Sequence, residues 1–353
     1  MLDVWTEKYR PQKLLEIKGQ ESITSRLDAF VRAKSFPHLL FAGPAGVGKT
    51  TAALAIAKEL YGENWRDHVL ELNASDNRGI DTIRGAVKDF ARTRAMEEVP
   101  FKIIYLDECD ALTREAQDAL RRIMEDYTQT VRFILSCNYS SKIIPPIQSR
   151  CAIFRFKPLP KEVVEKVLVK VSELEGIDIH PDALAIIYAA SEGDMRKAYN
   201  LLQACSAVAI PLSEKYKDVY EGKNLFENSK IKHIDTANVT KEILRKVIDL
   251  QTVSQVVSFA EPKEIELVIK NAIGGRFVEA RKLLTDVMVK HGLSGIDIIK
   301  QIQKELQELE MDEKLKVNLV RACGEYEFRL VEGSNEFVQL YAMLADFAII
   351  GTK

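Results

Sequence analysis

Gly43-Pro44-Ala45-Gly46-Val47-Gly48-Lys49-Thr50 fits the pattern G-x-x-x-x-G-K-[ST]. The segment stands between a strand-like run at 38–42 and a helix-like segment at 49–60, which is the context of a P-loop. Glycines let backbone N–H groups converge on phosphates, and the helix N-terminus adds positive potential. Lys49 is expected to neutralise β- and γ-phosphate oxygens, and Thr50 to coordinate Mg²⁺. The predicted ligands are ATP and Mg²⁺. The predicted nucleotide-binding residues here are Gly43, Pro44, Ala45, Gly46, Val47, Gly48, Lys49, Thr50 and Thr51.

A second apolar strand, further along the chain, ends in two carboxylates. Ile103-Ile104-Tyr105-Leu106-Asp107-Glu108 has the form of a Walker B element. If this strand neighbours the one before the P-loop, Asp107 lies beside it and holds Mg²⁺ directly or through water. Glu108 would orient and polarise the attacking water, because phosphoryl transfer depends mainly on positioning and charge stabilisation. The alternative is an acidic N-terminus of the next helix.

A third polar side chain, Asn138, follows the strand predicted at 131–136. The carboxyl ends of parallel strands border the nucleotide crevice, so this amide is expected to hydrogen-bond the γ-phosphate or the water. Alone, an Asn at a strand end is more often a turn residue. Together with the two motifs above, it completes a predicted catalytic set of Lys49, Asp107, Glu108 and Asn138. Thr50 and Asp107 are the predicted metal ligands.

Two arginines stand where they can reach beyond their own segment. Arg150 follows 143–149, which the consecutive prolines exclude from regular helix. Arg196 opens a predicted helix after Gly193-Asp194-Met195, from which it can fold over a bound nucleotide. For either arginine alone, a surface ion pair is the default interpretation.

Strand and helix patterns alternate over the first part of the chain, which predicts an α/β domain with a parallel sheet flanked by helices at 1–158. Strand signals stop after Pro158-Leu159-Pro160. A small helical domain is predicted at 159–236, with a polar connection at 213–235, and an all-α domain at 237–353. The strands are expected at 38–42, 69–72, 101–106 and 131–136, and the helices at 49–60, 114–126, 162–175, 181–190 and 194–210.

Apolar residues in the last domain recur at helical spacing. Ile299, Ile302, Leu306 and Leu309 form one stripe on a helix. The simplest interpretation is a core within the domain.

Composition restricts the class of protein. The chain has 353 residues, 46% of them hydrophobic, and a net charge of −2, which excludes a globally basic nucleic-acid coat. Its apolar stretches are shorter than the roughly 20 residues that span a bilayer, and its N-terminus lacks a secretory signal. Cys109, Cys137, Cys151, Cys205 and Cys323 are widely spaced, which indicates reduced thiols. We expect a cytoplasmic protein with no membrane association.

Several motifs together closely resemble small subunits of replication factor C, the AAA+ sliding-clamp loader of archaea and eukaryotes. The motifs are Trp5-Thr6-Glu7-Lys8-Tyr9-Arg10-Pro11, the P-loop, Leu72-Asn73-Ala74-Ser75-Asp76, Asp107-Glu108-Cys109-Asp110, Ser149-Arg150-Cys151 and Gly193-Asp194-Met195-Arg196. Their joint order and spacing are specific, and the similarity runs along the whole chain. General likeness favours the archaeal type; a eukaryotic member would be nuclear.

The resemblance implies roles for individual residues. Arg150 would act in trans in a neighbouring subunit's site, and Asn138 and Arg196 would be the first and second sensors of the nucleotide. Asn73 would restrain Glu108 until DNA is bound. The residues that enclose the adenine would be Val4, Tyr9, Arg10 and Pro11.

The resemblance also implies partners. They are other small subunits and one large subunit, packed through a C-terminal collar into a five-membered ring, together with a sliding clamp and primer-template DNA. Phe90, Met96, Val99 and Phe101 would lie near the clamp.

A basic helix face provides a candidate DNA surface. If 81–94 is helical, Arg84, Lys88 and Arg92 lie on one face, with Arg78 just before it. Cations at this spacing can follow a phosphate backbone without reading bases. The alternative is a solvated basic face.

Three other functions compete with this interpretation. A bacterial-type loader subunit is disfavoured because the chain lacks a cysteine zinc module, and a branch-migration motor is disfavoured by Ser149-Arg150-Cys151. A scaffold that binds ATP without hydrolysing it is disfavoured by the intact P-loop and Walker B residues.

Overall fold

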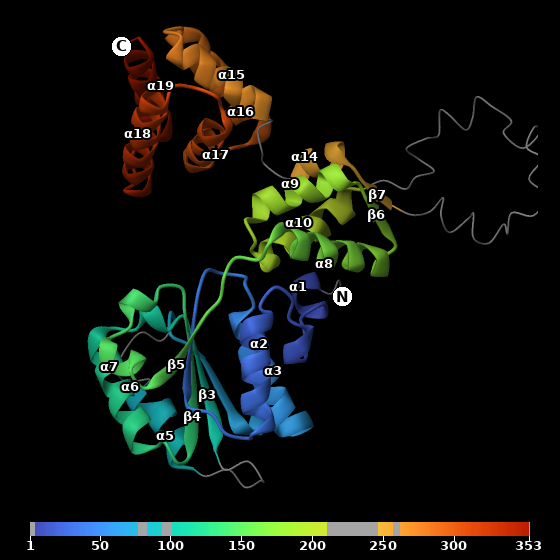
Figure 1. Ribbon diagram of the computed structural model, residues 1–353, viewed down its shortest axis with the longest axis vertical. Coiled ribbons are helices and arrows are strands. Elements are labelled where there is room, and N and C mark those ends of the chain that lie inside the picture. The colour runs from blue at the N-terminus through green and yellow to red at the C-terminus, as the bar shows by residue number, and fades with distance from the viewer. Residues whose placement is uncertain (1–3, 77–82, 94–100, 210–245, 257–261, 353) are drawn as a thin grey trace, which may run out of the picture. The chain divides into compact units, whose positions relative to one another are not determined.

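The computed structural model (Figure 1) describes residues 4–76, 83–93, 101–209, 246–256 and 262–352. The chain divides into two compact units, Met1–Val253 and Ser254–Lys353. The first unit extends past residue 237, where the sequence predicts the last domain to begin. The reason is that β7 (Lys246–Ile248) pairs in parallel with β6 (Ile177–Ile179). The expectation that strands end at Pro160 was therefore wrong; two three-residue strands are too short to show a periodicity.

A five-stranded parallel sheet forms the centre of the first unit, in the order β2-β3-β4-β1-β5. The predicted parallel α/β fold is confirmed. The fifth strand was not predicted, because its sequence follows directly on the proline-containing segment. The strands are β1 (His38–Ala42), β2 (Val69–Asn73), β3 (Lys102–Asp107), β4 (Val131–Cys137) and β5 (Cys151–Arg155).

Alternate residues of the strands supply two hydrophobic cores, one on each face of the sheet. On β3, Ile103 and Tyr105 join one core, and Ile104 and Leu106 join the other. Helices cover both faces (Figure 1). The first core also includes α2 (Glu21–Arg32) and α3 (Lys49–Tyr61), and the second includes α5 (Lys88–Arg92), α6 (Arg114–Asp126) and α7 (Pro145–Gln148).

The short helix α7 corrects one expectation. The consecutive Pro145 and Pro146 predict that 143–149 is not regular helix, yet they occupy the first two positions of a four-residue helix. Proline is tolerated there because the N–H group it lacks has no partner within the helix.

Three predicted helices pack together after the sheet: α8 (Lys161–Leu174), α9 (Pro181–Ser191) and α10 (Met195–Val208). Together with β6 and β7 they form what we call the lid, and α14 (Leu250–Val256) follows at the boundary between the two units. The N-terminal helix α1 (Trp5–Lys8) contacts α10, and the Trp5 backbone N–H donates to Gln203 Oε1 at 3.1 Å. Helix α1 therefore packs against the lid.

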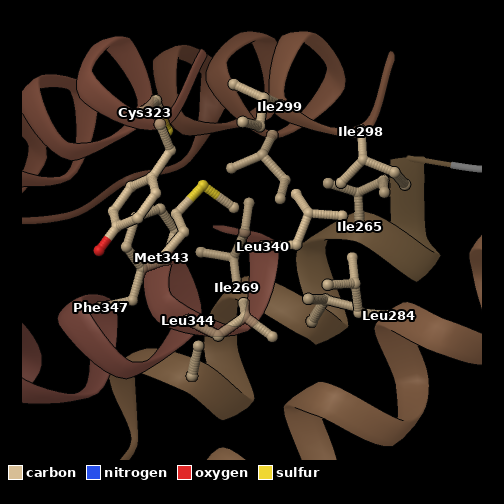
Figure 2. Close-up of a cluster of buried hydrophobic side chains, with 14 of the residues drawn as sticks. Ile265, Ile269, Leu284, Ile298, Ile299, Cys323, Leu340, Met343, Leu344 and Phe347 are labelled. Carbon is tan, nitrogen blue, oxygen red and sulfur yellow. The ribbon is translucent and has the colours of Figure 1, made fainter. Parts of the chain in front are cut away.

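The second unit is helical, as predicted. Its core contains Ile299, Ile302 and Leu306, each 0% exposed. Figure 2 shows Ile299 in this core together with Leu340 and Phe347. Leu309 packs against the same core while remaining partly buried. The apolar stripe is thus internal to the unit. The helices are α15 (Pro262–Ile273), α16 (Phe277–His291), α17 (Gly295–Glu308), α18 (Glu313–Val331) and α19 (Glu336–Gly351).

Short turns of tighter or wider helix complete the described chain. They are the 3₁₀ turns η1 (Leu14–Glu16), η2 (Gly62–His68), η4 (Cys109–Ala111) and η5 (Ser140–Lys142), and the π-helical turn η3 (Ile83–Val87). All five cysteines are free thiols, and only Cys151 is not fully buried. Among the described residues, no helix is both long enough and apolar enough to cross a membrane.

Candidate nucleotide site

A cavity of about 910 Å³ opens where the P-loop meets the carboxyl ends of β3 and β4, the N-terminal segment and the lid. Among the predicted site residues that line it are Tyr9, Arg10, Pro11, Ala45, Gly46, Val47, Gly48, Lys49, Thr50, Thr51, Asp107, Glu108, Asn138 and Arg196. Residues distant in sequence thus converge on one cavity. Gly43 and Pro44 do not line the cavity, but their carbonyl oxygens accept hydrogen bonds from Lys49 Nζ.

Lys49 is 8% exposed at the base of the cavity. Its Nζ donates to the carbonyl oxygens of Gly43 and Pro44, both at 2.6 Å, and to Asn138 Oδ1 at 3.2 Å. Burial lowers the pKa of the lysine, while the negative charge of Asp107 opposes that change. The P-loop carbonyl oxygens thus hold the Lys49 ammonium group next to the side-chain amide of Asn138, which follows β4.

Thr50 and Asp107 form the predicted metal-binding pair. The Thr50 hydroxyl donates to Asp107 Oδ2 at 2.9 Å. The sequence predicts this contact if β1 and β3 are neighbours, but β4 lies between them. The contact forms nevertheless, because Thr50 extends from the first turn of α3 rather than from β1. Hard oxygen donors at this spacing suit Mg²⁺.

The buried Tyr105 forms a further hydrogen bond to this pair. The sequence alone did not predict this role. Its hydroxyl donates to Thr50 Oγ1 at 3.0 Å. Burial, followed by the charge of Asp107, raises the pKa of the phenol well above its ordinary value, so the hydroxyl keeps its proton. A tyrosine within an otherwise aliphatic strand was the available signal.

Glu108 occupies the left-handed region of backbone space, with φ 52° and ψ 37°. A non-glycine residue in this conformation is uncommon and costs roughly 1–2 kcal/mol. Its N–H donates to Asp107 Oδ1 at 2.9 Å, which stabilises the turn. The side chain is exposed and lines the cavity, while Asp107 remains half-buried.

Asp110 fixes the end of β4, which is another contribution that the sequence analysis missed. Its carboxylate accepts from the backbone N–H of Asn138 at 3.4 Å and of Tyr139 at 3.3 Å. The position of Asn138 beside Lys49 is therefore set by the loop after β3. The only sequence signal was a further acidic residue in Asp107-Glu108-Cys109-Asp110.

Asn73 lines the same cavity at the end of β2. Its Oδ1 accepts from the N–H and the hydroxyl of Ser75, both at 2.9 Å. Within the described residues, no hydrogen bond joins Asn73 to Glu108. The predicted restraint of Glu108 by Asn73 stays a prediction.

The lid contacts the P-loop directly. The Met195 N–H donates to the Gly46 carbonyl oxygen at 3.1 Å, and Asp194 caps α10 by accepting from the Lys197 N–H at 3.0 Å. Arg196, in the first turn of this helix, is exposed and lines the cavity. The hydrogen bond between Met195 and Gly46 therefore fixes the backbone position of Arg196 at the cavity.

The N-terminal segment closes another side of the cavity. The Tyr9 ring stacks on Tyr199 with centroids 6.4 Å apart, and its hydroxyl donates to Glu175, which also pairs with Lys8. Both lid partners were missed, because contacts over such sequence separations leave no local signal. Val4 is described but does not line the cavity and is 53% exposed, so the structure does not bring it to the predicted adenine site.

Arg150 lies away from the cavity of its own chain. It pairs with Glu125, and its Nη1 donates to the Pro146 carbonyl oxygen at 2.6 Å. Glu125 also accepts from Arg121 Nη1 at 3.1 Å. The guanidinium is thus held on α6, outside the cavity lining.

The predicted basic face is only partly described. Arg78 lies outside the described residues, as does the side chain of Arg84. Lys88 is half-buried, and Arg92 is exposed with its Nη1 3.9 Å from Asp89. Within the described part of 81–94, residues 83–92 are helical and Thr93 is extended. There, η3 is π-helical and precedes the five-residue α5, which changes the angular spacing between residues.

Phe101 is one of the residues predicted to lie near the clamp. It is 2% exposed and stacks edge-to-face on Phe36 with centroids 5.2 Å apart, so it belongs to the core. Phe90 is partly buried, with Lys102 Nζ 3.6 Å from its ring centroid. Met96 and Val99 lie outside the described residues.

The sheet order and the P-loop cavity define a nucleotide-binding P-loop ATPase of the AAA class. Residues 39–159 match the family described as "ATPase family associated with various cellular activities (AAA)". Residues 260–346 match "Replication factor C C-terminal domain".

Whole-chain relatives specify the family. The chain is 51% identical over 346 residues to the replication factor C small subunit of Methanococcus maripaludis strain C7, covering 98% of both chains. It is 48% identical to that of Sulfolobus acidocaldarius, covering 99% of this chain and 97% of the relative, and 45% identical to that of Archaeoglobus fulgidus, covering 99% of both. The chain belongs to the replication factor C small-subunit family, and it is an ATPase subunit of the clamp loader.

Solved structures of a different protein have a similar fold. The Thermotoga maritima RuvB Holliday junction branch migration motor matches with a TM-score of 0.52 at 19% identity, covering 75% of this chain and 79% of that one. At this identity the likeness concerns the fold alone.

Proposed function

We propose that the cavity binds ATP with Mg²⁺ and hydrolyses it to ADP and phosphate. The observation that carries the proposal is the contact of Thr50 with Asp107 at 2.9 Å, next to the ammonium group of Lys49. Two oxygen donors at a helix N-terminus fit a hard divalent cation, and the P-loop glycines fit a polyphosphate. When bound, Mg²⁺ would neutralise charge that develops on the phosphate oxygens.

The residues around this pair have separate roles in the proposal. Lys49 binds the β- and γ-phosphates, and Asn138 hydrogen-bonds the γ-phosphate or the attacking water. Glu108 orients that water, and its exposed carboxylate at the cavity wall is free of the hydrogen bonds that hold Asp107. Tyr9, Arg10 and Pro11 enclose the base.

We propose that two arginines complete the site from different directions. Arg196 reaches the phosphates from the lid of the same chain. Arg150 acts in trans on the nucleotide of a neighbouring subunit, which is supported by its position outside its own cavity. Hydrolysis would then require assembly, and the isolated chain would hydrolyse ATP slowly.

We propose that nucleotide binding works through the lid, because α10 contacts both the P-loop and the N-terminal segment. The proposed partners are other small subunits, one large subunit, a sliding clamp and primer-template DNA, with Arg78, Arg84, Lys88 and Arg92 as the DNA surface. The proposed location is the cytoplasm, as for an archaeal replication factor.

A nucleotide-locked scaffold is the function to be distinguished experimentally. Glu108→Gln should retain ATP binding and lose turnover in the assembled loader. Equal turnover in the variant and the wild type would instead support the scaffold.

A further inference from the structure

Tyr105 lies on β3, two positions before Asp107, and is 1% exposed. It does not line the nucleotide cavity. Its ring packs in the core cluster that contains Phe41, Ile103 and Ile134. A phenol hydroxyl in such surroundings has lost its water and requires a hydrogen-bond partner. That partner is Thr50 Oγ1, 3.0 Å away.

The two hydrogen bonds at Thr50 have a fixed direction. A threonine hydroxyl has one proton and two lone pairs. The carboxylate of Asp107 can only accept, so the single Thr50 proton points to Asp107 Oδ2 at 2.9 Å. Tyr105 must then be the donor in its own bond to Thr50. The result is a chain from the phenol through the threonine to the carboxylate.

This series of hydrogen bonds determines which lone pair of the Thr50 hydroxyl remains available. One lone pair accepts from Tyr105, the proton is committed to Asp107, and one lone pair is left over. Without the phenol, the threonine side chain would keep its bond to Asp107 but lose the second contact that fixes its oxygen. Outer-shell hydrogen bonds of this kind orient metal ligands and tune their affinity.

We propose that Tyr105 is a positioning residue for the metal-binding pair: its hydroxyl occupies one Thr50 lone pair and so orients the other towards the cation of the nucleotide complex. The proposal rests on the proposed function, in which Thr50 and Asp107 hold Mg²⁺. The tyrosine does not line the cavity, so its effect on the cation is transmitted through the pair, by its hydrogen bond to Thr50 and its proximity to Asp107.

The test is Tyr105→Phe in the full-length chain, which removes one hydroxyl and keeps the ring. A fluorescent ATP analogue is titrated in excess Mg²⁺ and, separately, in EDTA. The Kd in EDTA divided by the Kd in Mg²⁺ measures how much the cation strengthens binding. This ratio does not depend on turnover. We expect Tyr105→Phe to lower this ratio about tenfold, while the Kd in EDTA stays within about twofold of the wild type.

Tyr61→Phe is the matched control. Tyr61 is also buried, and its hydroxyl donates to a backbone carbonyl, that of Phe101, at 2.8 Å. Losing this bond affects stability to a similar degree without touching Thr50. We expect the control to keep the wild-type ratio.

Asp107→Asn distinguishes a failure of the proposed metal-binding pair from a failure of the role proposed for Tyr105. If the wild type and Asp107→Asn show the same ratio, the proposed metal pair itself is wrong. If Asp107→Asn lowers the ratio while Tyr105→Phe and Tyr61→Phe both keep it, the phenol is only structural and the proposal for Tyr105 is overturned.

Discussion

The backbone N–H of Met195 donates to the carbonyl oxygen of Gly46 across 3.1 Å, and so joins the first turn of lid helix α10 to the middle of the P-loop. The Asp194 carboxylate lies against the same glycine. A Cβ built on Gly46 would be 1.6 Å from Asp194 Oδ1. The glycine is therefore needed for the approach of the lid as well as for that of a phosphate.

Gly46→Ala should accordingly displace α10 and weaken ATP binding. The added methyl group meets a carboxylate, and the backbone has φ +67°, which costs a residue with a side chain about 1–2 kcal/mol. We expect a loss of affinity of about tenfold or more, measured by equilibrium titration of the isolated chain.

Gly62→Ala is the control for an alanine at positive φ without a steric clash. Gly62 has φ +62°, and a Cβ there would meet nothing within 4 Å. Equal losses of affinity in the two variants would refute the role of the lid contact.

Arg150→Ala should separate hydrolysis from binding. Because the arginine does not line its own cavity, the ATP affinity of the isolated chain should be unchanged. The ATPase rate of the assembled loader should fall by at least about tenfold, since trans-acting arginines contribute large factors to phosphoryl transfer. Arg121→Ala removes the other arginine on Glu125 and should reduce the rate less. Weaker ATP binding by the isolated Arg150→Ala chain would argue against action in trans.

His38 predicts an acid-sensitive first unit. Its Nδ1 accepts from the Phe133 N–H at 3.1 Å, and its Nε2 lies 3.3 Å from the Met124 carbonyl oxygen, which fixes the neutral tautomer. Burial lowers the pKa of His38 from 6.5 to about 4. Below pH 6.5 the unfolded state binds the extra proton first, so stability is lost as the pH falls from about 6.5 towards about 4.

The contribution of His38 to this loss should be about 2 kcal/mol between pH 7 and pH 5. Chemical denaturation followed by tryptophan fluorescence measures it, since Trp5 and Trp65 are the two tryptophans of the sequence and both lie in the first unit. His38→Gln should be less stable at pH 7 and should depend less on pH in this range. An unchanged pH profile in the variant would contradict the assignment.

The basic segment around α5 predicts a salt-dependent effect on DNA. Arg84→Ala combined with Lys88→Ala should weaken DNA stimulation of the ATPase and reduce the slope of log affinity against log salt by about 2. Arg32→Ala, an exposed arginine on α2 paired with Asp28, serves as the surface control. If DNA stimulation and the salt slope equal those of the wild type, this surface does not bind DNA.

Local patterns predicted much of the fold and the site. Apolar runs and the P-loop gave four of the five strands of the main sheet and the cavity floor, because both signals are contained in a few consecutive residues. Glu175 and Tyr199 could not be found in this way, since their relevance depends on how α1 packs against the lid. The π-helical η3 and the burial of Phe101 likewise follow from tertiary packing rather than from spacing.

The proposed ATP-driven loading is best tested by the ATPase rate of the chain, alone and assembled with its large-subunit partner, with and without sliding clamp and primed DNA. We expect a low rate for the chain alone and strong joint stimulation by clamp and primed DNA, abolished by Glu108→Gln. An assembled rate that clamp and primed DNA leave unchanged would contradict it.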